Sequence, residues 1–102
     1  MIMATSEQIE GKNIIKTIGM AKGSTIYNQG RDVMASLRGV VGGEITEYTK
    51  LLAESRGQAI QRMVEDAEKQ GANAIVSVRL TTSMVMSNAS EMLAYGTSVV
   101  IE

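Results

Sequence analysis

The sequence predicts an α+β domain with the element order β-β-α-α-β-β, a mainly antiparallel sheet and one long helix packed on it. Three observations predict this class. Residues 14–26 follow a β-like pattern, residues 46–69 carry apolar residues at helical spacing, and two alternating segments flank a turn near residues 87–90. Strands on either side of a helical pair are typical of a layered α+β domain. At 102 residues we expect one domain, spanning residues 1–102.

The N-terminal elements are predicted to be two strands that form a hairpin. The first covers residues 2–5, a turn follows over residues 10–13, and the second runs from Ile14 to about Ile26. Gly19 and Gly23 indicate a bulge or a strong bend in this second strand, because glycine within a strand weakens regular pairing.

A short helix is predicted from Arg31 to Val40. Asp32 lies in its first turn, where a negative charge interacts favourably with the helix dipole. Gly42 and Gly43 end this helix and act as a hinge, since glycine permits a sharp change of chain direction.

A second, longer helix is predicted between Thr46 as N-cap and Gly71 as C-cap. Its apolar stripe consists of Tyr48, Leu52, Ala59, Met63 and Ala67, widened by Leu51, Ile60 and Val64. Arg62–Asp66 and Glu65–Lys69 are predicted as ion pairs on the solvent side. A helix of about 25 residues is roughly 37 Å long. A compact domain of this size is about 26 Å across, so the helix should extend beyond its own domain and need another cover.

The C-terminal segments are predicted to form a hairpin. Ala74, Val76, Val78 and Leu80 share one face of the first strand, and Leu93, Tyr95, Val99 and Ile101 share one face of the second. A two-residue turn at Asn88-Ala89 would place Val78 opposite Val99 and Val76 opposite Ile101.

The composition excludes several functions. The chain has no histidine and no cysteine, which removes the usual soft-metal ligands, thiol chemistry and Ser-His or Cys-His nucleophile pairs. The net charge is −1 and the charges are well mixed, which argues against a nucleic-acid partner. No apolar run is long enough to span a membrane, and residues 1–4 are too short and uncharged for a signal peptide. We therefore expect a soluble, cytoplasmic protein with no cofactor and no tight metal site.

The core is predicted to be thin. The chain has no Phe, no Trp and only three Tyr, so Val, Ile, Leu, Ala and eight Met must fill the interior. Aromatic residues carry the largest buried areas, and small domains without them often recruit apolar surface by self-association. The composition thus favours a homo-oligomer.

Two motifs admit a functional and a structural interpretation. Residues 39–43 are glycine-rich but lack the Gly-Lys-Ser/Thr ending of a phosphate-binding loop, so a corner between helices is preferred. Met84, Met86 and Met92 could offer thioethers to Cu(I), but methionine as core filler is the better interpretation in a chain without Phe.

A small set of polar and aromatic residues forms the candidates for ligand binding or for a subunit interface. Arg56 is expected near the inward side of the long helix, paired with a carboxylate or with backbone carbonyls at the interface. The full set is Arg38, Tyr48, Arg56, Arg79, Glu91 and Tyr95.

The ordered set of these residues resembles the YbjQ-like family over nearly the whole chain. Its carriers are Arg31-Asp32, Arg38 with Gly42-Gly43, Tyr48, Arg56, the run Gly71-Ala72-Asn73-Ala74-Ile75-Val76, and Tyr95-Gly96-Thr97-Ser98-Val99. The resemblance implies an α+β subunit that assembles into a ring, typically a homopentamer, in which strands of neighbouring subunits build a shared barrel. The family carries a heavy-metal-binding label, which no His or Cys of this chain matches, and it implies no catalytic residues.

Two hypotheses follow for the function. The first is a non-enzymatic homo-oligomer, a pentamer as the resemblance implies, that binds a metal ion or small ligand at subunit interfaces. The second is an enzyme with a composite site between subunits that uses Arg56, Tyr48 and Glu91.

Overall fold

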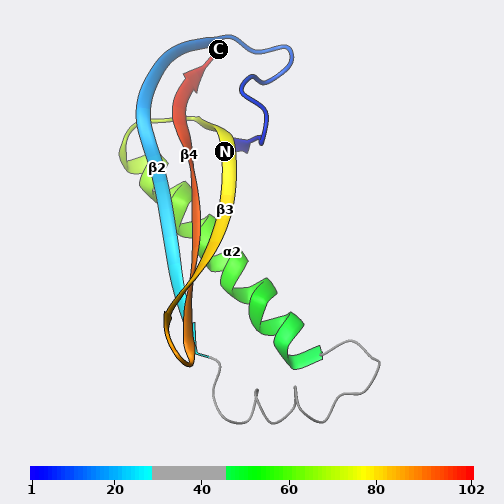
Figure 1. The fold of residues 1–102 in the computed structure, drawn as a ribbon. Coiled ribbons are helices and arrows are strands. Elements are labelled where there is room, and N and C mark those ends of the chain that lie inside the picture. Colours follow the sequence, from blue (N-terminus) through cyan, green and yellow to red (C-terminus); the bar gives the residue numbers. More distant parts are fainter. Residues whose placement is uncertain (29–45) are drawn as a thin grey trace.

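The computed structural model describes residues 1–28 and 46–102, without the side chains of residues 46–48. This part of the chain contains β1 (Ile2–Met3), β2 (Ile14–Asn28), α2 (Thr46–Lys69), β3 (Ala74–Met86) and β4 (Ala89–Ile101). Figure 1 shows α2 crossing one side of a narrow, curved sheet and diverging from it toward the N-terminal end of the helix. The predicted overhang assumed a domain about 26 Å across, whereas the longest dimension is 52 Å. The helix expected at residues 31–40, Arg38 and the hinge glycines Gly42 and Gly43 lie outside the described residues.

The four strands form one mixed sheet in the order β1-β3-β4-β2. β2 and β3 both pair antiparallel with β4, and β1 pairs parallel with β3, with Ile2 opposite Ala74. The prediction of an α+β domain with a helix on a mainly antiparallel sheet is therefore confirmed in outline. The predicted N-terminal hairpin is wrong. β1 is only two residues long, and β2 begins beside the end of β4, where the Asn13 N–H donates to the Glu102 carbonyl.

The β3–β4 hairpin has a different register from the predicted one. Its turn is Ser87-Asn88, so Met86 pairs with Ala89, and Val76 lies opposite Thr97 rather than Ile101. The register also shifts between Val76 and Arg79, where Ser77 has a positive φ of 54°. This β-bulge adds one residue to β3 and breaks its regular alternation. Val78 therefore packs against the core beneath α2, and not with Val76 and Val99.

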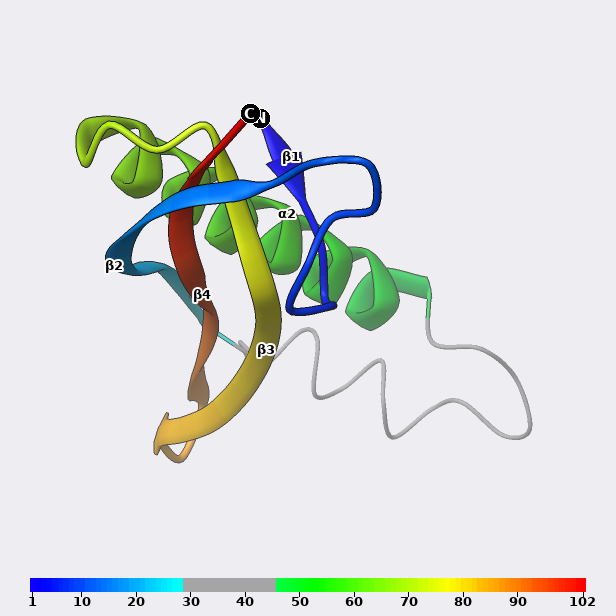
Figure 2. The same cartoon turned by 90° about the horizontal axis from the view of Figure 1, so that it is seen from above.

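The main core lies between α2 and the sheet. Ala59, Met63 and Ala67 of the helix are fully buried, as the predicted stripe requires, and they pack with Ala21 and Ala94 of the sheet. A second, smaller cluster lies on the other face of the sheet, where Ile9 of the N-terminal segment packs against Ala74, Val76, Val99 and Ile101. Figure 2 shows the N-terminal segment beside β3, with α2 passing behind the strands.

The close approach of α2 to the sheet depends on Gly23. A Cβ at this position would lie 2.2 Å from the backbone nitrogen of Met63 and 2.4 Å from the carbonyl oxygen of Ala59. A side chain there would force helix and strand apart, because the contact is with helix backbone rather than with the end of a flexible side chain. The bend predicted from Gly23 is in fact the crossing point of β2 and α2.

The C-terminus of α2 ends at the predicted glycine. Gly71 has a φ of +88°. The Gly71 N–H donates to the Glu68 carbonyl and the Ala72 N–H donates to the Ala67 carbonyl. This pair of bonds is the Schellman motif, in which a left-handed glycine satisfies the last carbonyls of a helix.

Candidate functional site

Two polar side chains of α2 and one from the turn directly after it occupy the outer edge of β2. Arg62 Nη1 donates to the Ser24 carbonyl, Asp66 Oδ2 accepts from the Lys22 N–H at 3.0 Å, and Gln70 Nε2 donates to the Met20 carbonyl at 2.9 Å. The spacing matches, because four helical residues rise about 6.0 Å and two strand residues about 6.7 Å. We call this set the edge cap. Arg62 and Asp66 thus bind β2, whereas the sequence predicted that they would pair on the solvent side.

Gln70 also connects the edge cap to the central strand β4. Its Oε1 accepts a hydrogen bond from the hydroxyl of Ser98, a fully buried residue of β4. Its Nε2 also lies 3.3 Å from Asp66 Oδ2. One amide therefore connects the end of α2 with β2, β4 and the neighbouring member of the cap.

The opposite edge of the sheet belongs to β3 and is covered over only part of its length. The Val78 N–H donates to the Ala4 carbonyl at 3.0 Å and the Ser77 N–H donates to the Ser6 carbonyl at 2.9 Å. Arg79 extends this cover by donating to the Thr5 carbonyl at 2.8 Å. From residue 80 to Met86, no second strand lies on this edge within the described part of the chain.

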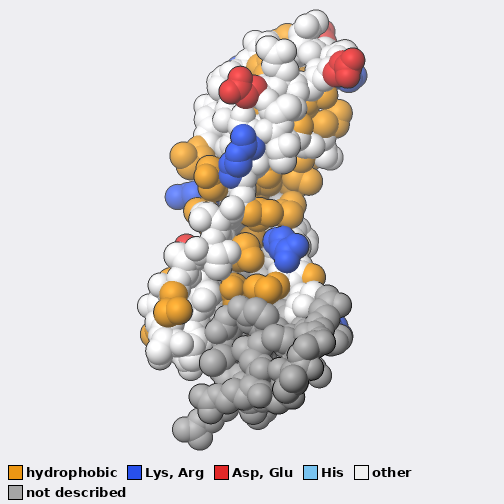
Figure 3. Space-filling view, turned by 45° about the vertical axis from the view of Figure 1, so that its right-hand side comes forward, with side chains coloured by type: hydrophobic (Ala, Val, Ile, Leu, Met, Phe, Trp, Pro, Cys, Tyr) orange, Lys and Arg blue, Asp and Glu red, His pale blue; other side chains and the backbone are white. Residues whose placement is uncertain are grey.

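The uncovered part of β3 exposes both backbone and apolar side chains. Because the Val78 N–H points to the edge, alternation directs the backbone groups of Leu80, Thr82 and Met84 outward as well. Met84 is 75% exposed, Met86 63% and Ile26 of β2 66%. Figure 3 shows hydrophobic side chains exposed in a broken band along the side of the molecule that carries β3 and α2. We call residues 80–86 of β3 the open edge.

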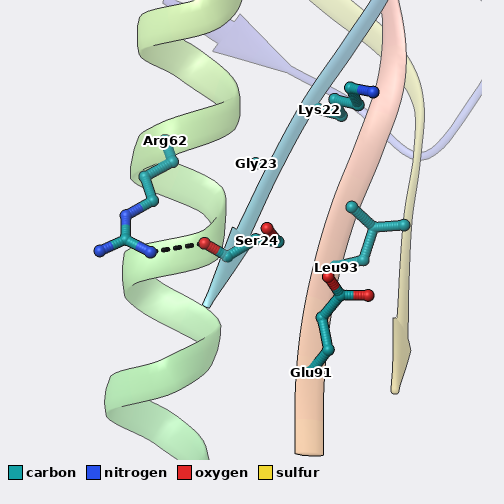
Figure 4. A pocket seen from close by; sticks show the side chains of 6 residues that line it. All are labelled: Lys22, Gly23, Ser24, Arg62, Glu91 and Leu93. Carbon is teal, nitrogen blue, oxygen red and sulfur yellow. Dashed lines mark hydrogen bonds between the residues drawn. The ribbon is translucent and has the colours of Figure 1, made fainter. Parts of the chain in front are cut away.

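An open cleft of about 460 Å³ lies where β2 meets both β4 and α2. Figure 4 shows Lys22, Leu93 and Glu91 along the strands, and Arg62 reaching Ser24 from the helix. The lining residues are Lys22, Gly23, Ser24, Arg62, Glu91 and Leu93. Two cations, one carboxylate, one hydroxyl and one apolar side chain therefore surround a space large enough for a small organic ligand.

The structure separates the residues that the sequence singled out. Arg56 is exposed on α2, contrary to the inward position expected. Arg79 is exposed and binds the carbonyls of Thr5 and Val78. Glu91 and Tyr95 are half-buried on β4. They point away from α2, because the alternating residues Met92 and Ala94 pack beneath the helix.

Among the members of this set whose side chains the structure describes, only Glu91 lines the cleft. Arg56 and Glu91 lie on opposite faces of the sheet within one chain. The side chain of Tyr48 lies outside the described structure, like Arg38. The sequence analysis missed Lys22, Arg62 and Leu93 as cleft residues. The Arg62–Asp66–Gln70 spacing over α2 and the turn directly after it was the signal that could have located the edge, because it presents three polar groups on the flank of the buried stripe.

Met84, Met86 and Met92 lie near the same end of the β3–β4 hairpin but differ in burial. Met92 is buried in the main core, where its sulfur accepts a hydrogen bond from the Thr82 hydroxyl at 3.4 Å. Met84 and Met86 are exposed at the far end of β3. The core-filler interpretation therefore holds for Met92, and also for the fully buried Met63, but not for the exposed Met84 and Met86.

The described residues offer a heavy metal little to bind. They contain no group of three or more His, Cys, Asp or Glu that could hold an ion, and the whole sequence has no His or Cys. Zinc and the softer metals prefer imidazole and thiolate ligands. The described residues of one chain therefore do not fit a heavy-metal centre. No helix in the described residues is long and apolar enough to cross a membrane.

Comparison with known proteins gives consistent matches over the whole chain. Residues 1–102 match the YbjQ family model, whose description is "Putative heavy-metal-binding". A UPF0145 protein of Methanosarcina acetivorans is 62% identical over 103 residues, covering 99% of this chain and 97% of that protein. A UPF0145 protein of Dehalococcoides mccartyi is 55% identical over 104 residues and both chains are fully covered.

A solved structure shares the fold. The crystal structure of a protein with unknown function from Pediococcus pentosaceus, of the DUF74 family, superposes with a TM-score of 0.66. It covers 100% of this chain and 98% of that one at 14% sequence identity. At this identity the likeness supports the fold alone.

Proposed function

Because this chain belongs to the YbjQ-like family, whose resemblance implies ring assembly, we propose that it is a non-enzymatic homo-oligomer. Its subunits join through the open edge of β3 into a pentameric ring that binds a small ligand. The observation that carries the proposal is the contrast between the two sheet edges. One edge is occupied by the edge cap, and residues 80–86 of the other have no partner strand in the described part of the chain.

A strand from a second subunit is the simplest partner for the unpaired backbone N–H and C=O groups of the open edge. Unpaired N–H and C=O groups on an edge strand are a template for another chain, and soluble proteins usually blunt such edges with charge, proline or a bulge. Residues 80–86 contain no charged residue and no proline. The exposed side chains of Leu80, Met84 and Met86 add apolar surface that a neighbouring subunit would bury.

A ring needs a head-to-tail contact, in which two different surfaces meet. Beyond the edge cap, Ile26 and Asn28 of β2 also turn backbone groups outward, because they continue the alternation of Met20, Lys22 and Ser24. β2 and β3 run in the same direction, since both are antiparallel to β4. The end of β2 is therefore the natural partner for the open edge of a neighbour.

The ligand is a small molecule rather than a heavy metal, because the chain has no imidazole and no thiolate donor. The enzyme hypothesis based on Arg56, Tyr48 and Glu91 would need a second subunit, since Arg56 and Glu91 belong to opposite layers. A cytoplasmic location accords with this role and with a chain that has no cysteine.

The mass in solution tests the assembly. Native mass spectrometry and light scattering on the tag-free chain should give about 55 kDa, five times the 10.9 kDa subunit. Thr82→Pro should lower the mass to that of the monomer, because proline removes one outward N–H of the open edge and is tolerated only on edge strands. The helical signal in the circular dichroism spectrum of Thr82→Pro should match that of the wild type, which would show that the subunit is still folded.

Thr82→Val is the matched control, since it also loses the hydroxyl that binds Met92 but keeps the backbone N–H. It should assemble like the wild type. A monomeric wild type at micromolar concentration would contradict the assembly. A wild-type oligomer that persists in Thr82→Pro would contradict the role of the open edge.

A further inference from the structure

The strand segment that forms the floor of the cleft is the most firmly held part of β2. The Lys22 N–H is bound by Asp66, Gly23 touches the backbone of α2, and the Ser24 carbonyl is bound by Arg62. Three consecutive residues are thus each anchored to the helix. A site whose backbone is already fixed binds a ligand without the cost of ordering it.

The charged groups above this floor are not engaged within the described chain. Neither the Lys22 ammonium nor the Glu91 carboxylate makes a hydrogen bond or ion pair there. Glu91 is nevertheless half-buried, although carboxylates are mostly exposed unless paired. Arg62 uses one nitrogen of its guanidinium for Ser24, which leaves other donors at the rim of the cleft.

The separation of these charges limits the ligand. Lys22 lies opposite Tyr95, which is four residues from Glu91 along β4, or about 13 Å at the rise of a strand. Figure 4 shows Leu93 between them. An extended tripeptide is about 10 Å long, and the two side chains can bridge the remainder. A carboxylate at the Lys22 end, an ammonium at the Glu91 end and an apolar group over Leu93 would complement these three side chains.

We infer that this cleft binds short zwitterionic peptides, with the C-terminal carboxylate on Lys22 and the N-terminal ammonium on Glu91. The inference rests on the proposed ligand-binding role and is independent of the ring, because all six lining residues belong to one chain. Arg62 positions the floor through the carbonyl of Ser24, which lies opposite Leu93 in the middle of the cleft.

The test is a titration of the tag-free wild-type chain with the tripeptide Gly-Leu-Gly. Binding is measured by two-dimensional NMR or by isothermal titration calorimetry. We expect saturable binding with shifts at residues 22–24 and 91–93. Lys22→Met keeps the apolar stem and the backbone N–H that Asp66 binds, and it should weaken binding at least tenfold. Glu91→Gln should do the same. Lys16→Met, an exposed lysine of the same strand outside the cleft, should bind like the wild type.

Peptides with a blocked terminus show which side chain binds which end of the peptide. N-acetylated Gly-Leu-Gly should bind weakly, and Glu91→Gln should then have no further effect, whereas Lys22→Met should still weaken it. Gly-Leu-Gly with a C-terminal amide should also bind weakly. For this peptide Lys22→Met should have no further effect, whereas Glu91→Gln should still weaken binding. Absence of saturable wild-type binding, or binding insensitive to both substitutions, would overturn the inference. If the wild-type chain is monomeric but binds the peptide, the proposed ring assembly is wrong and the peptide site stands. If the chain assembles but does not bind the peptide, the proposed peptide site is wrong and the ring assembly stands.

Discussion

The two edges of the sheet differ although they flank the same central strand. On β2, the edge cap of Arg62, Asp66 and Gln70 occupies alternate backbone groups. On β3, the N-terminal segment covers the edge as far as Arg79, and Leu80 to Met86 stay exposed. One helix cannot cover both edges, and α2 lies against β2 because Gly23 has no side chain to prevent the close approach. Closing one edge within the chain thus leaves the other available for contact between chains.

The strongest test of this comparison is Gly23→Ala, which places a methyl group against the backbone of α2. The new Cβ would meet Met63 N at 2.2 Å, so helix and strand must separate. We expect the free energy of unfolding to fall by about 3 kcal/mol, the upper range for overpacking. Urea denaturation measures it.

Gly19→Ala is the control on the same strand, because nothing lies within 4 Å of a Cβ at that position. It should change stability by less than about 0.5 kcal/mol. Equal effects of the two substitutions would show that α2 does not approach β2 through Gly23.

A medium effect is expected from Asp66→Ala, which removes the middle of the edge cap. The Lys22 N–H loses its charged acceptor, and such bonds contribute about 1.5–3 kcal/mol. We expect a loss near the lower limit, because the strand edge can bind water instead. Thermal and urea unfolding give the value.

Glu68→Ala removes the same charge from an exposed position of α2 and should stay within about 0.5 kcal/mol of the wild type. Should Asp66→Ala unfold like Glu68→Ala, the cap would contribute nothing to folding.

The smallest effect on folding is expected from Met84→Lys at the open edge. Met84 is 75% exposed, so the folded subunit should keep its stability within about 0.5 kcal/mol. Assembly should nevertheless weaken, because a lysine on an edge strand opposes strand addition. Light scattering at several concentrations measures the dissociation, and Lys50→Met on the exposed side of α2 serves as a surface control. Unchanged mass for Met84→Lys would place the subunit contact elsewhere.

The candidate site was only partly predictable. Glu91 was selected from the sequence and lines the cleft, but its companions Lys22 and Arg62 were not. They meet because α2 packs beside β2 at Gly23, a contact between residues about forty positions apart. Arg56 was expected to face inward, since it follows Tyr48 at two helical turns. The observed crossing places Ser55 and Ala59 inward, and Arg56 remains exposed.

What the sequence determined by itself is local. The bounds of α2 follow from the apolar stripe and from Gly71, whose left-handed conformation ends the helix whatever packs against it. The strands follow from alternation, and the absence of His and Cys restricts metal chemistry. Only the tertiary structure decided the partners of these elements. β1 joins β3 in parallel, the Ser77 bulge resets the β3–β4 register, and α2 closes one edge of the sheet. Alternation specifies which face of a strand is buried but not which strand lies beside it, because backbone hydrogen bonds are the same for every sequence.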